Sequence, residues 1–109
     1  MKLLVNKKQL GIAPAMWLRQ AGYVFLPERA DGQESFARRL SRDFYPRFHI
    51  YFLESRGNDG QELVTFNLHL DQKRPGYQGM SRHNAEYDGE VVEAELVRLK
   101  SLLLPDLFI

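Results

Sequence analysis

The side chains of this sequence best suited to chemistry are three histidines and an aspartate: His49, His69, Asp71 and His83. His69 and Asp71 are two residues apart in the alternating stretch 63–71, so on a strand they project from one face about 7 Å apart. His49 belongs to a second alternating run, 47–53, and a regular hairpin would bring it to the same face. Imidazoles and carboxylates bind zinc, manganese or iron, and such a divalent metal would activate water for hydrolysis. We therefore take the four residues as candidate metal ligands and candidate catalytic groups.

Two alternatives stay open for this histidine–aspartate group. The side chains could act as acid–base catalysts without a metal, because histidine titrates near neutral pH. They could also be half-exposed sheet residues that only hydrogen-bond to their neighbours. The sequence alone does not decide among the three.

Further polar and aromatic side chains near this group are candidates for binding a partner. They are Tyr51, Asn67, Lys73, Tyr77 and Tyr87. Lys73 follows Asp71 in the carboxylate-x-lysine order that is similar to half of a metal-dependent nuclease motif, but no acidic partner is near. The tyrosines could stack on bases or on a peptide, or they could pin the segment after the hairpin to the sheet.

A basic cluster lies upstream, at Arg38, Arg39 and Arg42. Contacts from such residues to phosphates would give an affinity for nucleic acid that does not depend on base sequence. The alternative is that the three arginines are the solvated face of a helix.

The elements that must position these side chains begin with a central β-hairpin. Alternating runs over about 47–54 and 62–71 flank a turn that contains Gly57 and Gly60, which predicts two antiparallel strands. The apolar residues of both runs then point to one face and the polar residues to the other. The short apolar run 23–26 predicts a further strand.

Three helices are expected to pack on the apolar face of this hairpin. A helix over 13–21 is indicated by Pro14 at its first turn and Gly22 after its end. A helix over 32–44 is indicated by a capping box at 31–34 and by an apolar residue at every fourth position from Phe36. A helix over 89–103 is indicated by the stripe Val92, Leu96, Leu99 and Leu103.

We therefore expect an α+β fold, a small antiparallel sheet built on the hairpin, in one domain over residues 1–109. Residues 72–88 have no helical or strand period and are expected to form a long ordered loop over the polar face. The apolar tail 105–109 could pack on its own core or join two copies as a homodimer.

Composition excludes several classes of site. The absence of cysteine rules out disulfides, thiolate zinc sites and cysteine nucleophiles, and it agrees with a cytoplasmic protein. A net charge of +1 gives no bulk argument for binding nucleic acid. No apolar run approaches the length of a membrane span, so we expect a soluble protein without a membrane partner.

The functional prediction is a small binding or accessory module. It would use the polar side of the hairpin and the 72–88 loop to hold a protein or a nucleic acid. The alternative is a small hydrolase, metal-dependent or acid–base, that uses His49, His69, Asp71 and His83. The sequence does not decide whether the protein is an enzyme.

Overall fold

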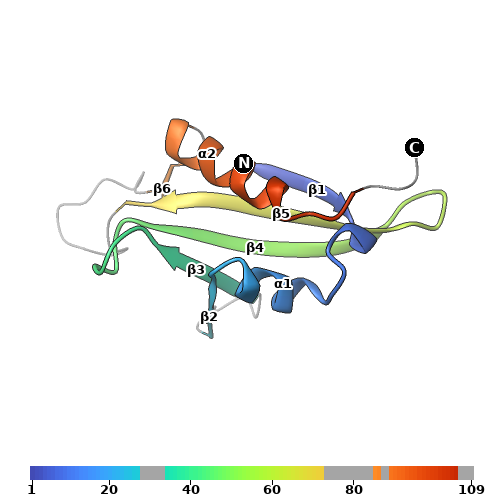
Figure 1. The fold of residues 1–109 in the computed structure, drawn as a ribbon, viewed down its shortest axis with the longest axis horizontal. Coiled ribbons are helices and arrows are strands. Elements are labelled where there is room, and N and C mark those ends of the chain that lie inside the picture. Colours follow the sequence, from blue (N-terminus) through green and yellow to red (C-terminus); the bar gives the residue numbers. More distant parts are fainter. Residues whose placement is uncertain (28–33, 73–84, 87–88, 106–109) are drawn as a thin grey trace.

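The computed structural model describes residues 1–27, 34–72, 85–86 and 89–105, and its strands form one antiparallel sheet (Figure 1). The strands are β1 (Lys2–Asn6), β2 (Val24–Leu26), β3 (Ser35–Arg39), β4 (Arg47–Arg56), β5 (Glu62–Asp71) and β6 (Ala85–Glu86). Their order is β1-β5-β4-β3-β2, and β6 also pairs with β5. The predicted α+β fold class is confirmed.

The long hairpin β4–β5 forms the centre of this sheet, as the alternating pattern predicts. Its register runs from Arg47 opposite Asp71 to Arg56 opposite Glu62. Gly60 closes the turn with a φ of 84°, a backbone conformation that residues with a side chain rarely adopt. The hairpin places residues of β4 and β5 at fixed positions opposite each other, which decides the geometry of the candidate site.

In the described part of the chain, two α-helices and a short 3-10 helix accompany the sheet: η1 (Lys7–Gln9), α1 (Pro14–Gln20) and α2 (Glu90–Ser101). Pro14 is the first residue of α1, and Gly22 follows the helix with a φ of 102°. These helices confirm the predictions over 13–21 and 89–103. Among the residues that the structure describes, no helix combines the length and apolar character that crossing a membrane requires.

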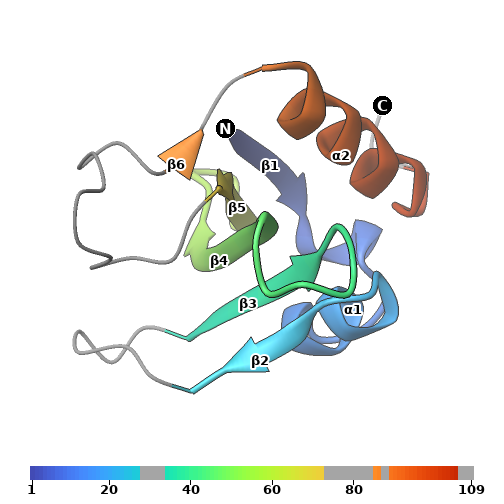
Figure 2. The ribbon, with the colours of Figure 1, turned by 90° about the vertical axis from the view of Figure 1, so that its left-hand side faces the viewer.

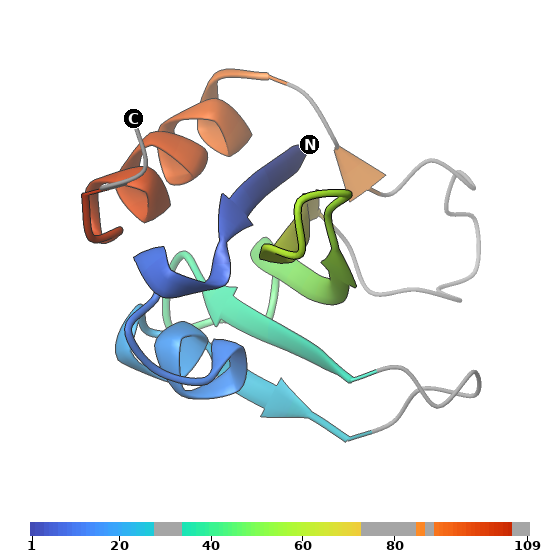
Figure 3. The ribbon, with the colours of Figure 1, turned by 90° about the vertical axis from the view of Figure 1, so that its right-hand side faces the viewer.

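Both α-helices lie on the same side of the sheet, as the two end-on views show (Figures 2 and 3). We call this side the helix face; it carries Phe48, Ile50, Phe66 and Leu68. We call the other side the polar face, and define it by the cross-strand rows that contain Tyr51, Asn67, His49, His69 and Asp71.

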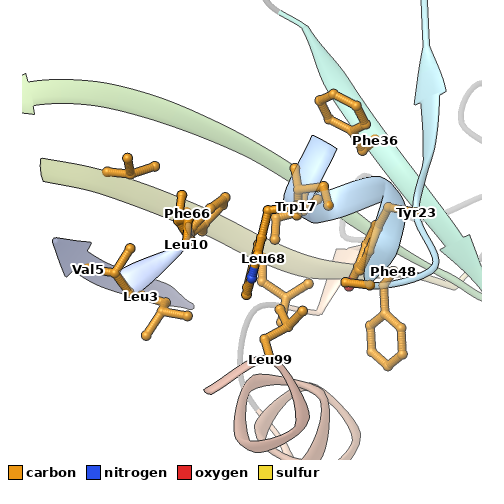
Figure 4. Packing of buried hydrophobic residues seen from close by; sticks show 14 of the residues in the cluster. Leu3, Val5, Leu10, Trp17, Tyr23, Phe36, Phe48, Phe66, Leu68 and Leu99 are labelled. Atoms are coloured by element: carbon orange, nitrogen blue, oxygen red, sulfur yellow. The ribbon is translucent and has the colours of Figure 1, made fainter. Parts of the chain in front are cut away.

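The core lies between the helix face and the two helices (Figure 4). Trp17 of α1 packs its ring 5.2 Å from that of Phe66, and Leu99 of α2 is fully buried. The predicted stripe of the last helix is confirmed, because Val92 and Leu99 are buried and Leu96 and Leu103 pack against the same core.

The predicted helix over 32–44 is wrong, because residues 35–39 form strand β3 between β2 and β4. The four-residue spacing of apolar residues misled the prediction. Phe36 alone enters the core, while Leu40 and Phe44 are exposed. Backbone pairing on both sides, a tertiary effect, decides the conformation. Strand β1 was not predicted either.

Several predicted residues lie outside the described part of the chain. They are His83, Lys73, Tyr77 and Tyr87, with most of the 72–88 loop and residues 106–109 of the tail. Within the segment predicted as a loop, Ala85–Glu86 forms β6, which pairs with Asp71 and Leu70.

Candidate metal centre

The hairpin register brings His49 of β4 directly opposite His69 of β5 on the polar face. Their rings lie 4.5 Å apart between centroids at an angle of 74°, and His49 Nδ1 is 2.9 Å from His69 Nε2. Asp71, the next residue of β5 on this face, points back toward both rings. Its Oδ1 lies 3.0 Å from His69 Nε2, and its Oδ2 lies 3.6 Å from His49 Nδ1. Three of the four predicted candidates therefore meet at one point, and we call them the triad.

The triad is a group that could hold a metal ion, since each member offers one ligand atom and these atoms lie within 4.8 Å of one another. Ligand atoms bound about 2.0–2.2 Å from a metal ion lie roughly 3.0–3.5 Å from each other. The two nitrogens are 2.9 Å apart, and each has its own Asp71 oxygen nearby, Oδ1 at 3.0 Å from His69 Nε2 and Oδ2 at 3.6 Å from His49 Nδ1. These separations are close to that range. A small cation could therefore bind with little movement of the side chains.

Proton placement in the triad shows why a cation would suit it. An ionised Asp71 only accepts hydrogen bonds, so His69 Nε2 must carry a hydrogen to face Oδ1 at 3.0 Å. His49 Nδ1, 2.9 Å from the same nitrogen, can then only accept. Three electron-rich atoms, one from each side chain, thus lie close together. A divalent cation bound between them would be coordinated by a lone pair of each of these three atoms.

The electrostatics keep Asp71 in the ionised form that a metal requires. Burial by itself raises the pKa of the Asp71 carboxyl. The hydrogen bond with His69, the electrostatic effect of the two histidines and the charge of Arg47 more than offset this, so its pKa lies below the ordinary value. Arg47 contributes through Nε, which is 3.5 Å from Asp71 Oδ2.

The triad is well shielded from solvent, with exposed fractions of 8% for His49, 7% for His69 and 9% for Asp71. Ala37 of β3 completes the row across the two histidines and is also buried. The small alanine leaves space for the rings. In a site with few competing waters, charge–dipole and metal–ligand interactions are strengthened.

The neighbouring row of the polar face contains two other predicted binding residues. Tyr51 of β4 and Asn67 of β5 lie directly opposite each other, and both are partly exposed. Ser35 of β3 is opposite Tyr51 and fully buried, and within the described part of the chain its hydroxyl has no hydrogen-bond partner. Ser35 was missed because the segment was predicted as a helix.

Comparison with protein-family models, with curated proteins and with solved structures finds no match to this chain.

The predicted arginine cluster is not a single surface. Because successive residues of a strand face opposite ways, Arg38 lies on the helix face and Arg39 on the polar face. Arg42 is exposed in the loop after β3. The structure therefore separates Arg38 from the other two, whereas Arg39 and Arg42 stay close, since Arg39 Nη1 donates a hydrogen bond of 3.4 Å to the Arg42 carbonyl.

A second buried polar cluster, which the sequence did not predict, lies on the helix face around Glu95 of α2. The Tyr23 hydroxyl donates a hydrogen bond of 2.6 Å to Glu95 Oε2. Arg98 donates to both carboxylate oxygens, at 2.7 and 2.9 Å, and to the Ala21 carbonyl at 2.7 Å. Arg38 Nη1 is 3.5 Å from Glu95 Oε1. Every charge has a partner, so this cluster joins α2 to the sheet rather than offering a site.

A signal for this cluster was present in the sequence. Glu95 follows Val92 by three residues and precedes Leu99 by four, which places a carboxylate within the apolar stripe of the last helix. A charged residue at such a position must find partners inside the fold.

An open hollow of about 710 Å³ lies at the other end of the sheet, between η1 and the hairpin turn. Its lining includes Lys7, which is 3.0 Å from Glu54 and 3.5 Å from Glu62. Lys7 is paired there, and the lining residues include no histidine. The chemistry therefore favours the triad.

Proposed function

We propose that this protein is a metal-dependent hydrolase whose centre is a divalent transition-metal ion bound by His49, His69 and Asp71. The observation that carries the proposal is the convergence of three possible ligand atoms, one each from His49, His69 and Asp71, within 4.8 Å of one another. Imidazole nitrogens with one carboxylate suit zinc, iron and other transition metals better than magnesium or calcium. We take Zn²⁺ as the probe.

Hydrolysis is the reaction class that such a ligand set suits. A divalent ion with three protein ligands keeps a position for water or substrate and makes a bound water reactive near neutral pH. The chain itself would supply rigid placement, because two of the ligands lie opposite each other on the two central strands. Arg47 would hold Asp71 through its second oxygen.

The prediction that the polar face holds a protein or nucleic-acid partner stays a prediction. No contact among the described residues favours one partner over another, whereas the triad favours a metal ion. Metal-free acid–base catalysis remains the outcome to be expected if the triad binds no ion.

The first experiment is a zinc titration of protein purified without a histidine tag. We expect one Zn²⁺ per chain, bound with an affinity that falls roughly 100-fold or more in Asp71→Asn. That substitution keeps the shape of the side chain and removes the charged ligand. Asn67→Ala, on the same strand and face but outside the triad, is the matched control and should bind zinc like the wild type. Sub-stoichiometric zinc, or equal affinity in Asp71→Asn, would contradict the metal centre.

The second experiment measures hydrolysis of p-nitrophenyl acetate and p-nitrophenyl phosphate. We expect turnover by the zinc-loaded chain, loss of turnover after chelation, and recovery when zinc is restored. Asp71→Asn should lose this activity and Asn67→Ala should retain it. If a zinc-loaded chain hydrolyses neither compound, or if Asp71→Asn is as active as the wild type, the hydrolase assignment fails.

A further inference from the structure

Two arginines face each other at the edge of the triad. Arg39 of β3 lies directly opposite Arg47 of β4, and Arg47 in turn lies opposite Asp71 of β5. This row is next to the row of the two histidines. The side chains of both arginines therefore project from the polar face, beside the triad. Like charges directly opposite each other destabilise a sheet. Such a pair is therefore better explained by a ligand than by stability.

Each guanidinium is oriented by an aromatic ring from the loop between β3 and β4. Arg39 Cζ lies 4.0 Å from the centre of the Phe44 ring, and Arg47 Cζ lies 4.7 Å from that of Tyr45. A cation–π contact of this kind favours one position of the guanidinium and leaves N–H groups available to an anion. The backbone carbonyl of Arg42 also accepts a hydrogen bond from Arg39 Nη1, at 3.4 Å.

Positive charge exceeds negative charge in this row. Arg47 is 3.5 Å from Asp71, whereas Arg39 forms no ion pair with a carboxylate in the part of the chain that the structure describes. With a divalent ion on the triad, one carboxylate would face three cationic groups. An anion with several acceptor oxygens would offset this excess of positive charge.

We infer that Arg39, Arg47 and the triad-bound metal ion form one site for a terminal phosphate group, and that the substrate is a phosphate monoester. This inference rests on the proposed metal centre. The three free oxygens of a monoester can meet the metal ion and both guanidinium groups, whereas a carboxylate offers only two oxygens. A diester also offers only two free oxygens. Arg39 is assigned to binding, and Arg47 both to binding and to the positioning of Asp71.

The test uses the full chain loaded with Co²⁺ and inorganic phosphate as the probe. Paramagnetic Co²⁺ broadens the ³¹P signal of a phosphate that binds next to it, and the Zn²⁺-loaded chain is the diamagnetic reference. We expect strong broadening in the wild type and a phosphate affinity at least tenfold weaker in Arg39→Gln, with zinc affinity unchanged. Arg42→Gln removes the same charge from an exposed position and should behave like the wild type.

Three further ligands identify the group that is bound. Phenyl phosphate should compete with inorganic phosphate, while dimethyl phosphate and acetate should compete at least tenfold less well. A 5′-phosphorylated dinucleotide carries the same terminal phosphate, and its strength relative to phenyl phosphate tells a nucleic-acid end from a small molecule. Arg39→Gln is expected to weaken the binding of both phenyl phosphate and the dinucleotide.

The failures can be told apart. If zinc binds but phosphate does not, or if Arg39→Gln and Arg42→Gln weaken phosphate equally, the phosphate site is overturned and the metal centre stands. Equal phosphate binding by the metal-free chain also overturns the shared site. If the wild type binds no zinc, the proposed metal centre is contradicted, and the phosphate site that depends on it is contradicted as well. Arg39→Lys, which keeps the charge but loses the planar fork, should bind phosphate with intermediate strength if the assignment is right.

Discussion

Glu95 is a carboxylate with only 4% of its surface exposed, on the side of α2 that packs against the sheet. An unpaired charge there would cost several kcal/mol, roughly enough to unfold a small domain. Tyr23, Arg98 and Arg38 surround it instead. Burial, the hydrogen bond to Glu95 and the charge of Glu95 raise the pKa of the Tyr23 phenol far above its ordinary value.

This raised pKa predicts a loss of stability at alkaline pH. Below about pH 10 the phenol is protonated in both states, and the stabilising effect is complete. Above that pH the unfolded chain loses the proton while the folded chain retains it, so the free energy of unfolding falls as pH rises. In Tyr23→Phe this component of the alkaline fall should be absent.

The same variant should be less stable at neutral pH, by about 1.5–3 kcal/mol, because it loses a buried hydrogen bond to a charged acceptor. Urea unfolding at pH 7 and at pH 10.5 measures both effects. Tyr51→Phe, which removes a hydroxyl from the opposite face of the sheet, is the control and should leave the alkaline fall in place. An unchanged pH dependence in Tyr23→Phe would show that Tyr23 does not carry it.

Strand β3 shows how an element is decided by its neighbours. It pairs with β2 on one side, over residues 35–37, and with β4 on the other, over residues 35–39. The change from helix to strand moves Arg38 to the helix face, where it meets Glu95, and Arg39 to the polar face, beside Arg47. A single change of secondary structure therefore divides one predicted basic surface into a structural contact and a candidate ligand site.

Helix α2 depends on the stripe that it turns toward the sheet. Leu99 is fully buried in this stripe, whereas Val97, on the same helix, is 64% exposed. We expect Leu99→Ala to lower the free energy of unfolding by about 2–5 kcal/mol, since it leaves a cavity in the core. Val97→Ala removes methyl groups from the surface and should change it by less than about 0.5 kcal/mol. Denaturant unfolding compares the two variants, and equal effects would contradict the packing of α2.

At the scale of the molecule, the helices cover one side of the sheet (Figure 2). By the register of the hairpin, the triad lies on the other side, on β4 and β5. The core on the helix face holds β4 and β5 in register, and the register sets the distances within the triad. Stability and the candidate centre are therefore linked through the same hairpin.

This link predicts that zinc stabilises the whole domain. Zn²⁺ at 100 times its dissociation constant should raise the free energy of unfolding by about 2.7 kcal/mol if the unfolded chain binds it weakly. The midpoint of thermal unfolding should rise with zinc concentration in the wild type and in Asn67→Ala, and fall back when a chelator is added. Asp71→Asn should show little of this shift. A zinc-independent midpoint in the wild type would contradict the metal centre independently of any activity.

Much of the centre of the fold follows from local patterns in the sequence. The alternation of apolar and polar residues in 47–54 and 62–71 determined the hairpin and put His49, His69 and Asp71 on one side. The helices over 13–21 and 89–103 followed from proline, glycine and stripe positions. These features depend on neighbours in the chain, so local patterns suffice to predict them.

Tertiary structure decided what depends on distant segments. The exact register placed His49 opposite His69. It brought polar atoms of His49, His69 and Asp71 to distances of 2.9–3.6 Å, which a shared side of the sheet alone does not ensure. Pairing with β2 and β4 made 35–39 a strand against its helical spacing, and pairing with β5 made 2–6 a strand. The row of Arg39, Arg47 and Asp71 exists only because three strands meet, since sheet hydrogen bonds join residues that are far apart in the chain.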